Sequence, residues 1–262
     1  MKLYLKKSLG QHFLIDKNII KKIINLVKVS KKNVVEIGPG DGALTDEIIK
    51  ADPMHLTLVE KDSKLVKKLK DKYSKNKKIK IFQSDILKFN IEEMLKKNTV
   101  IFGNLPYNIS SQILVKFIQF HQWPPKFNDI IFMFQKELGD KVIGKFPSKD
   151  YGRLSILTNY RLNILNKFLV SPNCFYPKPK VNSQILHFSP KRKNRFKIRN
   201  ITNLEKVTNI LFSNKRKMIN KNLKKIISNH EIKMIPSLNT KLRPAEIKPE
   251  IYYKITEFFE KN

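Results

Sequence analysis

The chain has 262 residues, of which 41 % are hydrophobic and 10 % are aromatic, so it can build a core and should form at most two packed bodies. This composition excludes fibrous, low-complexity and disordered proteins. Lys and Arg number 53 against 22 Asp and Glu, and the resulting net charge of +31 predicts a polyanionic partner.

The cysteine count and the apolar runs predict a cytoplasmic protein that does not associate with membranes. The single cysteine, Cys174, cannot form an internal disulfide, which fits a reducing compartment and excludes a disulfide scaffold. No stretch reaches the roughly 18 consecutive apolar residues that a membrane span needs. The first seven residues lack the unbroken apolar core of a signal peptide.

Strand-like and helix-like segments alternate through the first two thirds of the chain. The expected strands are Asn33–Ile37, Leu56–Glu60, Ile79–Gln83, Thr99–Gly103 and Asp129–Phe134, with two late strands at Leu162–Val170 and Gln184–Phe188. The expected helices are Thr45–Lys50, Asp62–Tyr73, Ile91–Lys97 and Ser110–His121. Alternating units of this length predict an α/β fold, a doubly wound and mostly parallel sheet with helices on both faces.

The composition changes after Pro190. Apolar residues then recur at helical spacing, and Pro236, Pro244 and Pro249 divide the region into short helices. We therefore expect two domains, residues 1–190 and a small all-helical domain of residues 191–262. Residues 191–225 contain thirteen Lys or Arg and one acid, which makes this stretch the candidate nucleic-acid contact. An A/T-rich coding sequence, which favours Lys, Asn and Ile together, explains the overall charge equally well.

A glycine-rich turn follows the first expected strand. Gly38, Gly40 and Gly42 stand at alternate positions between this strand and the next helix, where backbone must pass close to a ligand. Glu60 ends the second strand about twenty residues later, where an acid meets ribose hydroxyls in such folds. The turn predicts a nucleotide-like ligand and does not separate a nicotinamide enzyme from a methyltransferase.

The third and fourth strands end in polar residues at the same edge of the sheet. Asp85 follows the third strand and is either a ligand contact or a helix N-cap. The fourth strand runs into Asn104-Leu105-Pro106-Tyr107. The Asn104 amide oxygen and the Leu105 carbonyl can accept hydrogen bonds from a planar amine such as that of adenine, which favours a pyramidal nitrogen with an available lone pair. Pro106 fixes the turn without an amide donor, and Tyr107 can stack on the base.

These segments resemble the small-subunit ribosomal RNA adenine dimethyltransferases, the kasugamycin-resistance family, along nearly the whole chain. The resemblance rests on Glu60, Asp85 and the segments 9–14 (LGQHFL), 35–40 (VEIGPG), 103–110 (GNLPYNIS), 135–137 (QKE), 151–155 (YGRLS) and 175–183 (FYPKPKVNS). It implies a Rossmann-like methyltransferase sheet that binds S-adenosylmethionine. It also implies dimethylation of two adjacent adenosines in the 3′-terminal hairpin loop of small-subunit rRNA, within a pre-assembled small ribosomal subunit and late in its assembly.

The resemblance also assigns roles to individual residues. The implied cofactor contacts are His12, Leu14, Gly38, Glu60, Asp85 and Asn104. Asn104, Leu105, Pro106 and Tyr107 would hold the target base, and Phe175 would offer a second aromatic face to the flipped adenosine; the alternative is a core phenylalanine beside prolines. Lys215, Arg216 and Lys217 would bind phosphate, as a solvated charged face would also allow.

Two departures and several alternatives remain at this stage. Many family members carry asparagine where His12 stands, and asparagine is usual at the position of Lys221. The alternatives are a large-subunit rRNA adenine methyltransferase, a noncatalytic RNA-binding assembly factor and, more remotely, a nicotinamide oxidoreductase. The histidines show no metal-ligand spacing with one another or with Cys174, so no metal is expected, and we expect a monomer.

Overall fold

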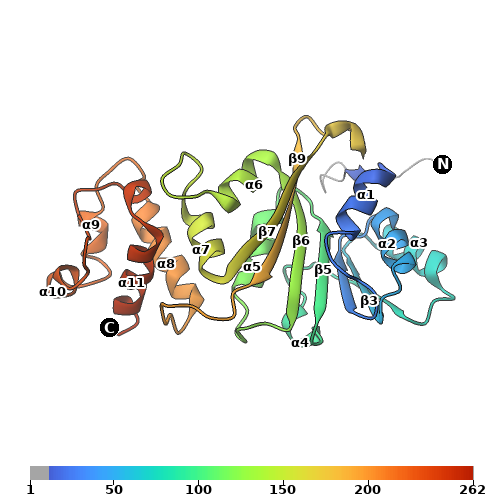
Figure 1. Cartoon of the computed structure of the whole chain (residues 1–262), viewed down its shortest axis with the longest axis horizontal. Coiled ribbons are helices and arrows are strands. Elements are labelled where there is room, and N and C mark those ends of the chain that lie inside the picture. Colours follow the sequence, from blue (N-terminus) through green and yellow to red (C-terminus); the bar gives the residue numbers. More distant parts are fainter. Residues whose placement is uncertain (1–11, 262) are drawn as a thin grey trace. The chain divides into compact units, whose positions relative to one another are not determined.

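A computed structural model describes residues 12–261 (Figure 1). The chain divides into two compact units, which are described separately. The first comprises residues 1–117, 124–139 and 164–190, and the second comprises residues 118–123, 140–163 and 191–262. Segments 118–123 and 140–163 thus cluster with the C-terminal region, whereas the sequence-based division placed them in residues 1–190. The assignment of separate roles to residues 1–190 and 191–262 stays a prediction.

The central sheet has seven strands among the described residues, in the order β4-β3-β2-β5-β6-β9-β7 (Figure 1). Their bounds are β2 Asn33–Ile37, β3 His55–Glu60, β4 Ile79–Gln83, β5 Thr99–Asn104, β6 Phe127–Gln135, β7 Leu162–Val170 and β9 Ser183–Pro190. Strands β2 to β6 are parallel to their neighbours, and β9 is antiparallel to β6. The predicted α/β class is confirmed, and each expected strand lies within one observed strand.

Helices cover both faces of this sheet. Successive side chains of a strand point to opposite faces, and nearly every residue of β2 and β5 is buried, so both faces must be covered. One face buries Val34, Leu58 and Phe102 in a cluster with α1 (Lys17–Ile24), α2 (Ala43–Lys50) and α3 (Ser63–Tyr73). On the opposite face Phe117 of α5 (Ser110–Ile118) packs edge-on against Phe132 at 5.6 Å between ring centroids. This packing holds the ends of the parallel strands in register and so fixes where their loops emerge.

A two-stranded ribbon accompanies the main sheet. Strand β1 (Phe13–Leu14) pairs antiparallel with β8 (Phe175–Tyr176), which follows the short 3-10 helix η2 (Pro172–Cys174). The Asp16 carboxylate caps α1 by accepting from the backbone N–H groups of Asn18 and Ile19 at 2.8 and 3.0 Å. The ribbon is absent from the sequence-based expectations, because a pairing between residues about 160 apart leaves no local pattern. Helix α1 is also absent from them, although its Asp16 cap and its buried isoleucines at helical spacing are local signals that were available.

Two expected helices end early. Helix α4 covers Ile91–Met94 and stops before the expected Lys97, because Leu95 is extended and Asn98 adopts a positive φ of 60°. Helix α5 stops at Ile118, and the Arg161 guanidinium donates to the carbonyls of Ile118 and Phe120 at 2.6 Å each. These carbonyls therefore find a partner outside the helix.

Residues 191–261 contain helices and turns and no strand, as expected. The helices are α8 Ile201–Phe212, α9 Asn220–Leu223, α10 Asn229–Lys233, η3 Pro244–Glu246 and α11 Pro249–Phe259. Helices α6 (Lys136–Ile143) and α7 (Arg153–Arg161) precede β7. Within the second unit the Tyr151 and Tyr253 hydroxyls donate to the carbonyls of Ile247 and Ile156 at 2.8 and 3.1 Å. No helix among the described residues is both long and apolar enough to cross a membrane.

Candidate active site

A cavity lies in the first unit at the carboxyl edge of β2, β3, β4 and β5, the edge where open α/β sheets bind ligands. The loops that follow these four strands line it together with the segment around β1. The lining residues are His12, Phe13, Leu14, Glu36, Ile37, Gly38, Pro39, Gly40, Asp41, Ala43, Leu44, Val59, Glu60, Lys61, Ser84, Asp85, Ile86, Asn104, Leu105, Pro106, Tyr107, Asn108, Ile109 and Ile113. The cavity therefore contains every implied cofactor contact and the whole segment 104–107.

The glycine-rich turn forms one wall of this cavity. Gly38 and Gly40 have φ values of +65° and +61°, which residues with a side chain rarely adopt. A Cβ on Gly40 would lie 2.7 Å from the Phe13 ring, whereas one on Gly38 would meet only the Asn104 carbonyl oxygen at 3.7 Å. Glycine at 40 thus lets Phe13 close over the turn, and glycine at 38 leaves the backbone bare beside Asn104.

Glu60 is nearly buried, with 6 % of its surface exposed, and its carboxylate organises the turn. Oε2 accepts from the Gly40 N–H at 3.3 Å, and Oε1 accepts from the N–H groups of Lys61 and Asp62 at 2.8 and 2.9 Å. Burial raises the pKa of Glu60, while these three N–H groups oppose the shift. A carboxylate has about four acceptor sites, so one site on Oε2 is left for a ligand hydroxyl.

Asp85 lines the cavity as a charged acceptor. Its Oδ1 accepts from the Leu87 N–H at 3.0 Å, and its Oδ2 pairs with the Lys61 Nζ at 2.9 Å. The Lys61 hydrogen bond, followed by that of Leu87, lowers the pKa of Asp85, so the carboxylate form is favoured. Asp85 is not a helix N-cap, because the next helix, α4, begins at Ile91 with Asn90 as its N-cap. Its carboxylate instead closes a turn through the Leu87 N–H and lines the cavity, and each oxygen keeps a further lone pair.

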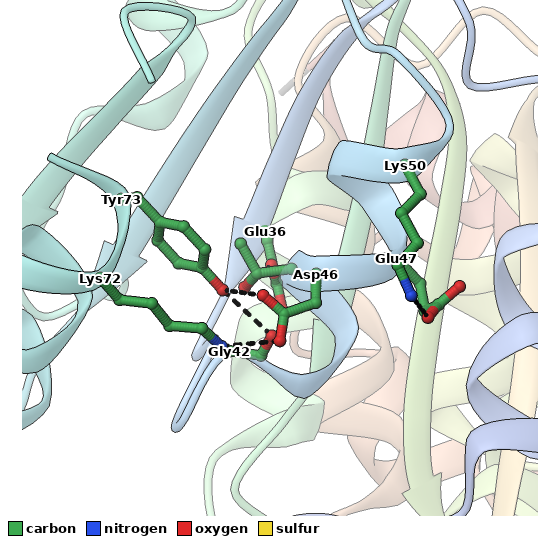
Figure 2. A network of polar contacts seen from close by, with 8 residues as sticks. Glu36, Gly42, Asp46, Glu47, Lys50, Lys72 and Tyr73 are labelled. Atoms are coloured by element: carbon green, nitrogen blue, oxygen red, sulfur yellow. Dashed lines mark hydrogen bonds and ion pairs between the residues drawn. The ribbon is translucent and has the colours of Figure 1, made fainter. Parts of the chain in front are cut away.

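A polar network lies beneath the glycine turn (Figure 2). The Tyr73 hydroxyl, at the end of α3, donates to Asp46 at 2.7 Å and to the Gly42 carbonyl at 3.2 Å, and Lys72 Nζ lies 2.6 Å from Asp46. Beside it the buried Glu36 accepts from Thr45 Oγ1 at 2.6 Å, and burial raises the pKa of Glu36 to about 8. This network was not predicted from the sequence. The available signal was that Tyr73 follows Leu69 by four residues, which places both on the buried face of α3.

Asn104 holds a fixed orientation at the end of β5. Its Nδ2 donates to the His12 carbonyl at 3.0 Å, and since a carbonyl only accepts, Oδ1 must be directed elsewhere. The His12 ring stacks on Tyr107 at 5.5 Å between centroids, and its Nδ1 donates to the Pro177 carbonyl at 2.7 Å. The Tyr107 hydroxyl shares a 2.6 Å hydrogen bond with Ser183 Oγ. Asn104 and Tyr107 thus both line the cavity, with the Asn104 amide oriented by the His12 carbonyl and one face of the Tyr107 ring covered by the His12 ring.

Two groups of predicted site residues lie outside the cavity. Phe175 is 3 % exposed and belongs to the core cluster that includes Leu14, so the structure gives it the core position that was the alternative reading. Its role as a second aromatic face stays a prediction and would require the side chain to leave the core. Lys215, Arg216 and Lys217 lie in the second unit, exposed in the turn between α8 and α9.

The cavity fits S-adenosylmethionine and offers no metal site. Glu60 retains an acceptor for a ribose hydroxyl, Asp85 is an acceptor suited to an adenine amine, and the bare backbone at Gly38 and Gly40 allows close approach. Within residues 12–261, no group of three His, Cys, Asp or Glu side chains could hold a metal ion. Residues 9–11 of the implied first motif lie outside the described residues.

Two solved structures of methyltransferases have folds similar to this chain over most of its length. A dimethyladenosine transferase from Plasmodium falciparum is 23 % identical to this chain, with a TM-score of 0.74. The match covers 95 % of this chain and 97 % of the transferase. The 23S rRNA methyltransferase ErmE is 22 % identical to this chain, with a TM-score of 0.69, and the match covers 95 % of this chain and 99 % of ErmE. At these identities the likeness establishes the fold alone, which is that of the Rossmann-like methyltransferases.

Sequence comparison narrows the class to one family. The chain matches the family described as ribosomal RNA adenine dimethylase over residues 3–261, and it belongs to that family. Two similar relatives are named ribosomal RNA small subunit methyltransferase A. The protein from Pelagibacter ubique is 41 % identical over 97 % of both chains. The protein from Malacoplasma penetrans is 38 % identical over 97 % of this chain and 92 % of its own length. The resemblance is confirmed, and with it the expectation of an rRNA adenine dimethyltransferase that uses S-adenosylmethionine.

Proposed function

We propose that the protein transfers methyl groups from S-adenosylmethionine to the exocyclic amines of two adjacent adenosines in the 3′-terminal hairpin loop of small-subunit rRNA. The observation that carries this proposal is the meeting of the glycine turn, Glu60 and the segment 104–107 around one cavity. Relatives named small subunit methyltransferase A, similar over nearly the whole chain, support the choice of the small subunit. We further propose that the protein is a cytoplasmic monomer that acts late in assembly, on a pre-assembled subunit.

The cofactor would lie between the glycine turn and the carboxylates. Glu60 would accept from its ribose and Asp85 from its adenine amine, while His12, Leu14, Gly38 and Asn104 would complete the contacts. The bound cofactor supplies a methyl group on a sulfonium, which is reactive without help from an acidic or basic side chain. The chain's contribution is therefore orientation and the exclusion of water.

The target adenine would meet the segment 104–107. Asn104 Oδ1 and the Leu105 carbonyl would accept the two amine hydrogens, which favours a pyramidal nitrogen whose lone pair is available to the methyl group. Because His12 covers one face of Tyr107, the base would stack on the other face. The methylated nitrogen is acidic and loses its proton without a dedicated base. Pro106 contributes by fixing the turn without an amide donor.

The direct test supplies methyl-labelled S-adenosylmethionine and undermethylated small ribosomal subunits, with undermethylated large subunits as the parallel substrate. Digestion of the RNA and mass analysis of the labelled nucleosides should give dimethyladenosine from the small subunit. Label in large-subunit RNA would favour the alternative shared with enzymes such as ErmE. Tight binding to small subunits without any label would favour a noncatalytic assembly factor.

Asn104→Ala separates catalysis from binding. It removes the oriented acceptor and the hydrogen bond to His12, so we expect methyl transfer to fall by at least about a hundredfold, the scale for losing one oriented polar group in an active site. Affinity for the subunit should stay near the wild-type value. The exposed Asn90→Ala, outside the cavity lining, is the matched control. Equal activity of the two variants would refute the proposed amine geometry.

A further inference from the structure

The ribbon of β1 and β8 sorts its aromatic residues onto two faces. Leu14 is opposite Phe175, and Phe13 is opposite Tyr176. Residues directly opposite each other in an antiparallel pair project to the same face, and successive residues project to opposite faces. Leu14 and Phe175 both lie in the core cluster, so Tyr176 lies on the other face of the ribbon, together with Phe13. Phe13 and Leu14 both line the cavity, so the ribbon stands beside it.

Tyr176 is unusually exposed for an aromatic residue beside a site. It has 53 % of its surface exposed, whereas Phe13 and Phe175 have 5 % and 3 %. A large exposed ring gains little from folding, because its apolar surface stays in water. An aromatic face of this kind beside a nucleic-acid site can stack on an unpaired base, since every base has a π-face.

The segment that follows Tyr176 is tied to the cavity at both ends. The Pro177 carbonyl accepts from the His12 ring at 2.7 Å, and Ser183 Oγ shares a 2.6 Å hydrogen bond with the Tyr107 hydroxyl. Both His12 and Tyr107 line the cavity. We call residues 176–182 the rim loop, because these two bonds hold it next to the place proposed for the target adenine.

The rim loop is basic and faces solvent. Lys178, Lys180, Val181 and Asn182 are all exposed, and no Asp or Glu occurs between residues 151 and 204 of the sequence. Exposed lysines beside an aromatic face are the combination with which proteins hold single-stranded nucleic acid, the lysines on phosphates and the ring on a base.

We propose that the rim loop binds the rRNA nucleotides that flank the target adenosine, with Tyr176 stacking on an adjacent base and Lys178 and Lys180 contacting the flanking phosphates. This proposal rests on the proposed function, since it names a further contact of the same substrate. It gives a base-stacking role to Tyr176, the residue after Phe175, for which the resemblance implies an aromatic contact with the flipped adenosine. The rim loop would thus keep the loop of the RNA hairpin open while one base occupies the cavity.

The test compares Tyr176→Ala and Tyr176→Phe in methyl transfer to undermethylated small subunits and in direct binding to a hairpin RNA with two adjacent loop adenosines. Losing one stacked base should raise the KM for subunits and the Kd for the hairpin by about tenfold in Tyr176→Ala. The KM for S-adenosylmethionine should stay near the wild-type value, and Tyr176→Phe should behave like the wild type because it keeps the ring. A general loss of structure would move the cofactor KM as well.

Matched variants far along the chain control for exposure and charge. Met54→Ala removes an apolar side chain that is 51 % exposed, and Lys75→Gln with Lys77→Gln removes two exposed charges outside the cavity lining. Lys178→Gln with Lys180→Gln should weaken hairpin binding more than the Lys75 and Lys77 pair does, and should lower its salt dependence.

The outcomes separate this proposal from the proposed function. If Tyr176→Ala binds RNA as Met54→Ala does, the rim loop is not the contact, even when methyl transfer to small subunits is intact. If Tyr176→Phe loses as much affinity as Tyr176→Ala, stacking is refuted. If the wild type methylates no subunit, the proposed function has failed, and the hairpin affinities of the same variants still decide whether the rim loop binds RNA.

Discussion

Substituting alanine at Gly38 and at Gly40 of the glycine turn should lower the stability of the protein by clearly different amounts. Both positions have φ near +60°, where a residue with a Cβ costs about 1–2 kcal/mol. At Gly38 the new Cβ meets only the Asn104 carbonyl at an ordinary 3.7 Å, so Gly38→Ala should cost only that amount. At Gly40 it lies 2.7 and 2.8 Å from two atoms of the buried Phe13 ring, and such overpacking adds about 1–3 kcal/mol.

Gly40→Ala is therefore expected to lower the free energy of unfolding by about 2–5 kcal/mol, against about 1–2 kcal/mol for Gly38→Ala. Urea unfolding followed by circular dichroism, without cofactor, measures both values and excludes any contribution from ligand binding. The comparison is internal because the two variants share the backbone strain and differ only in what the Cβ meets.

A double-mutant cycle isolates the contact with Phe13. In a Phe13→Ala background the overlap disappears, so Gly40→Ala should cost only the dihedral part, and the coupling energy should be about 1–3 kcal/mol. A coupling near zero, or equal costs for Gly38→Ala and Gly40→Ala, would show that Phe13 does not close over the turn as described.

Three further predictions concern the network under the turn and the basic turn of the second unit. Glu36 keeps its proton up to about pH 8 in the folded chain but loses it near 4.5 when unfolded, so stability should fall as the pH rises through this window, and a series of Tm values should show a flatter profile for Glu36→Gln. Tyr73→Phe removes the hydrogen bond to the Asp46 carboxylate and should cost about 1.5–3 kcal/mol in urea unfolding, and an unchanged midpoint would refute the role of the network. The turn between α8 and α9 carries three exposed cations, Lys215, Arg216 and Lys217. Neutralising all three should reduce the steepness of the fall of log RNA affinity with log salt concentration by about two to three. An unchanged slope would show that they face solvent and do not contact phosphates.

The fold was predictable because its signals are local. Each strand of the parallel sheet is a short β-branched run, and each connecting helix carries its own apolar spacing, so alternation along the sequence indicates the layered α/β class. The glycine turn and Glu60 were predictable for the same reason, since the order of strands places both at one edge of the sheet. The cavity lining bears this out by containing Gly38, Glu60, Asp85 and Asn104 together.

The missing parts depend on contacts between residues far apart in the chain. Strand β1 has two residues and pairs with β8 about 160 positions later, and Tyr73 reaches the glycine turn from the end of α3, about thirty residues further along the chain. Segments 118–123 and 140–163 join the second unit although they are separated from residues 191–262 in the chain. Such contacts are set by tertiary packing, for which a single sequence carries no periodic signal.

Phe175 and Tyr176 illustrate the limit most clearly. A run of aromatic and proline residues indicates an ordered loop, but which of two adjacent rings faces the core depends on the register of the ribbon, and a shift of one residue exchanges them. The pairing of Leu14 with Phe175 sends that ring inward, and the alternation then leaves Tyr176 outside. The same pairing holds His12 between Asn104 and Pro177, so the register of one two-residue strand determines both how the Asn104 amide is oriented and which of the two aromatic rings is exposed.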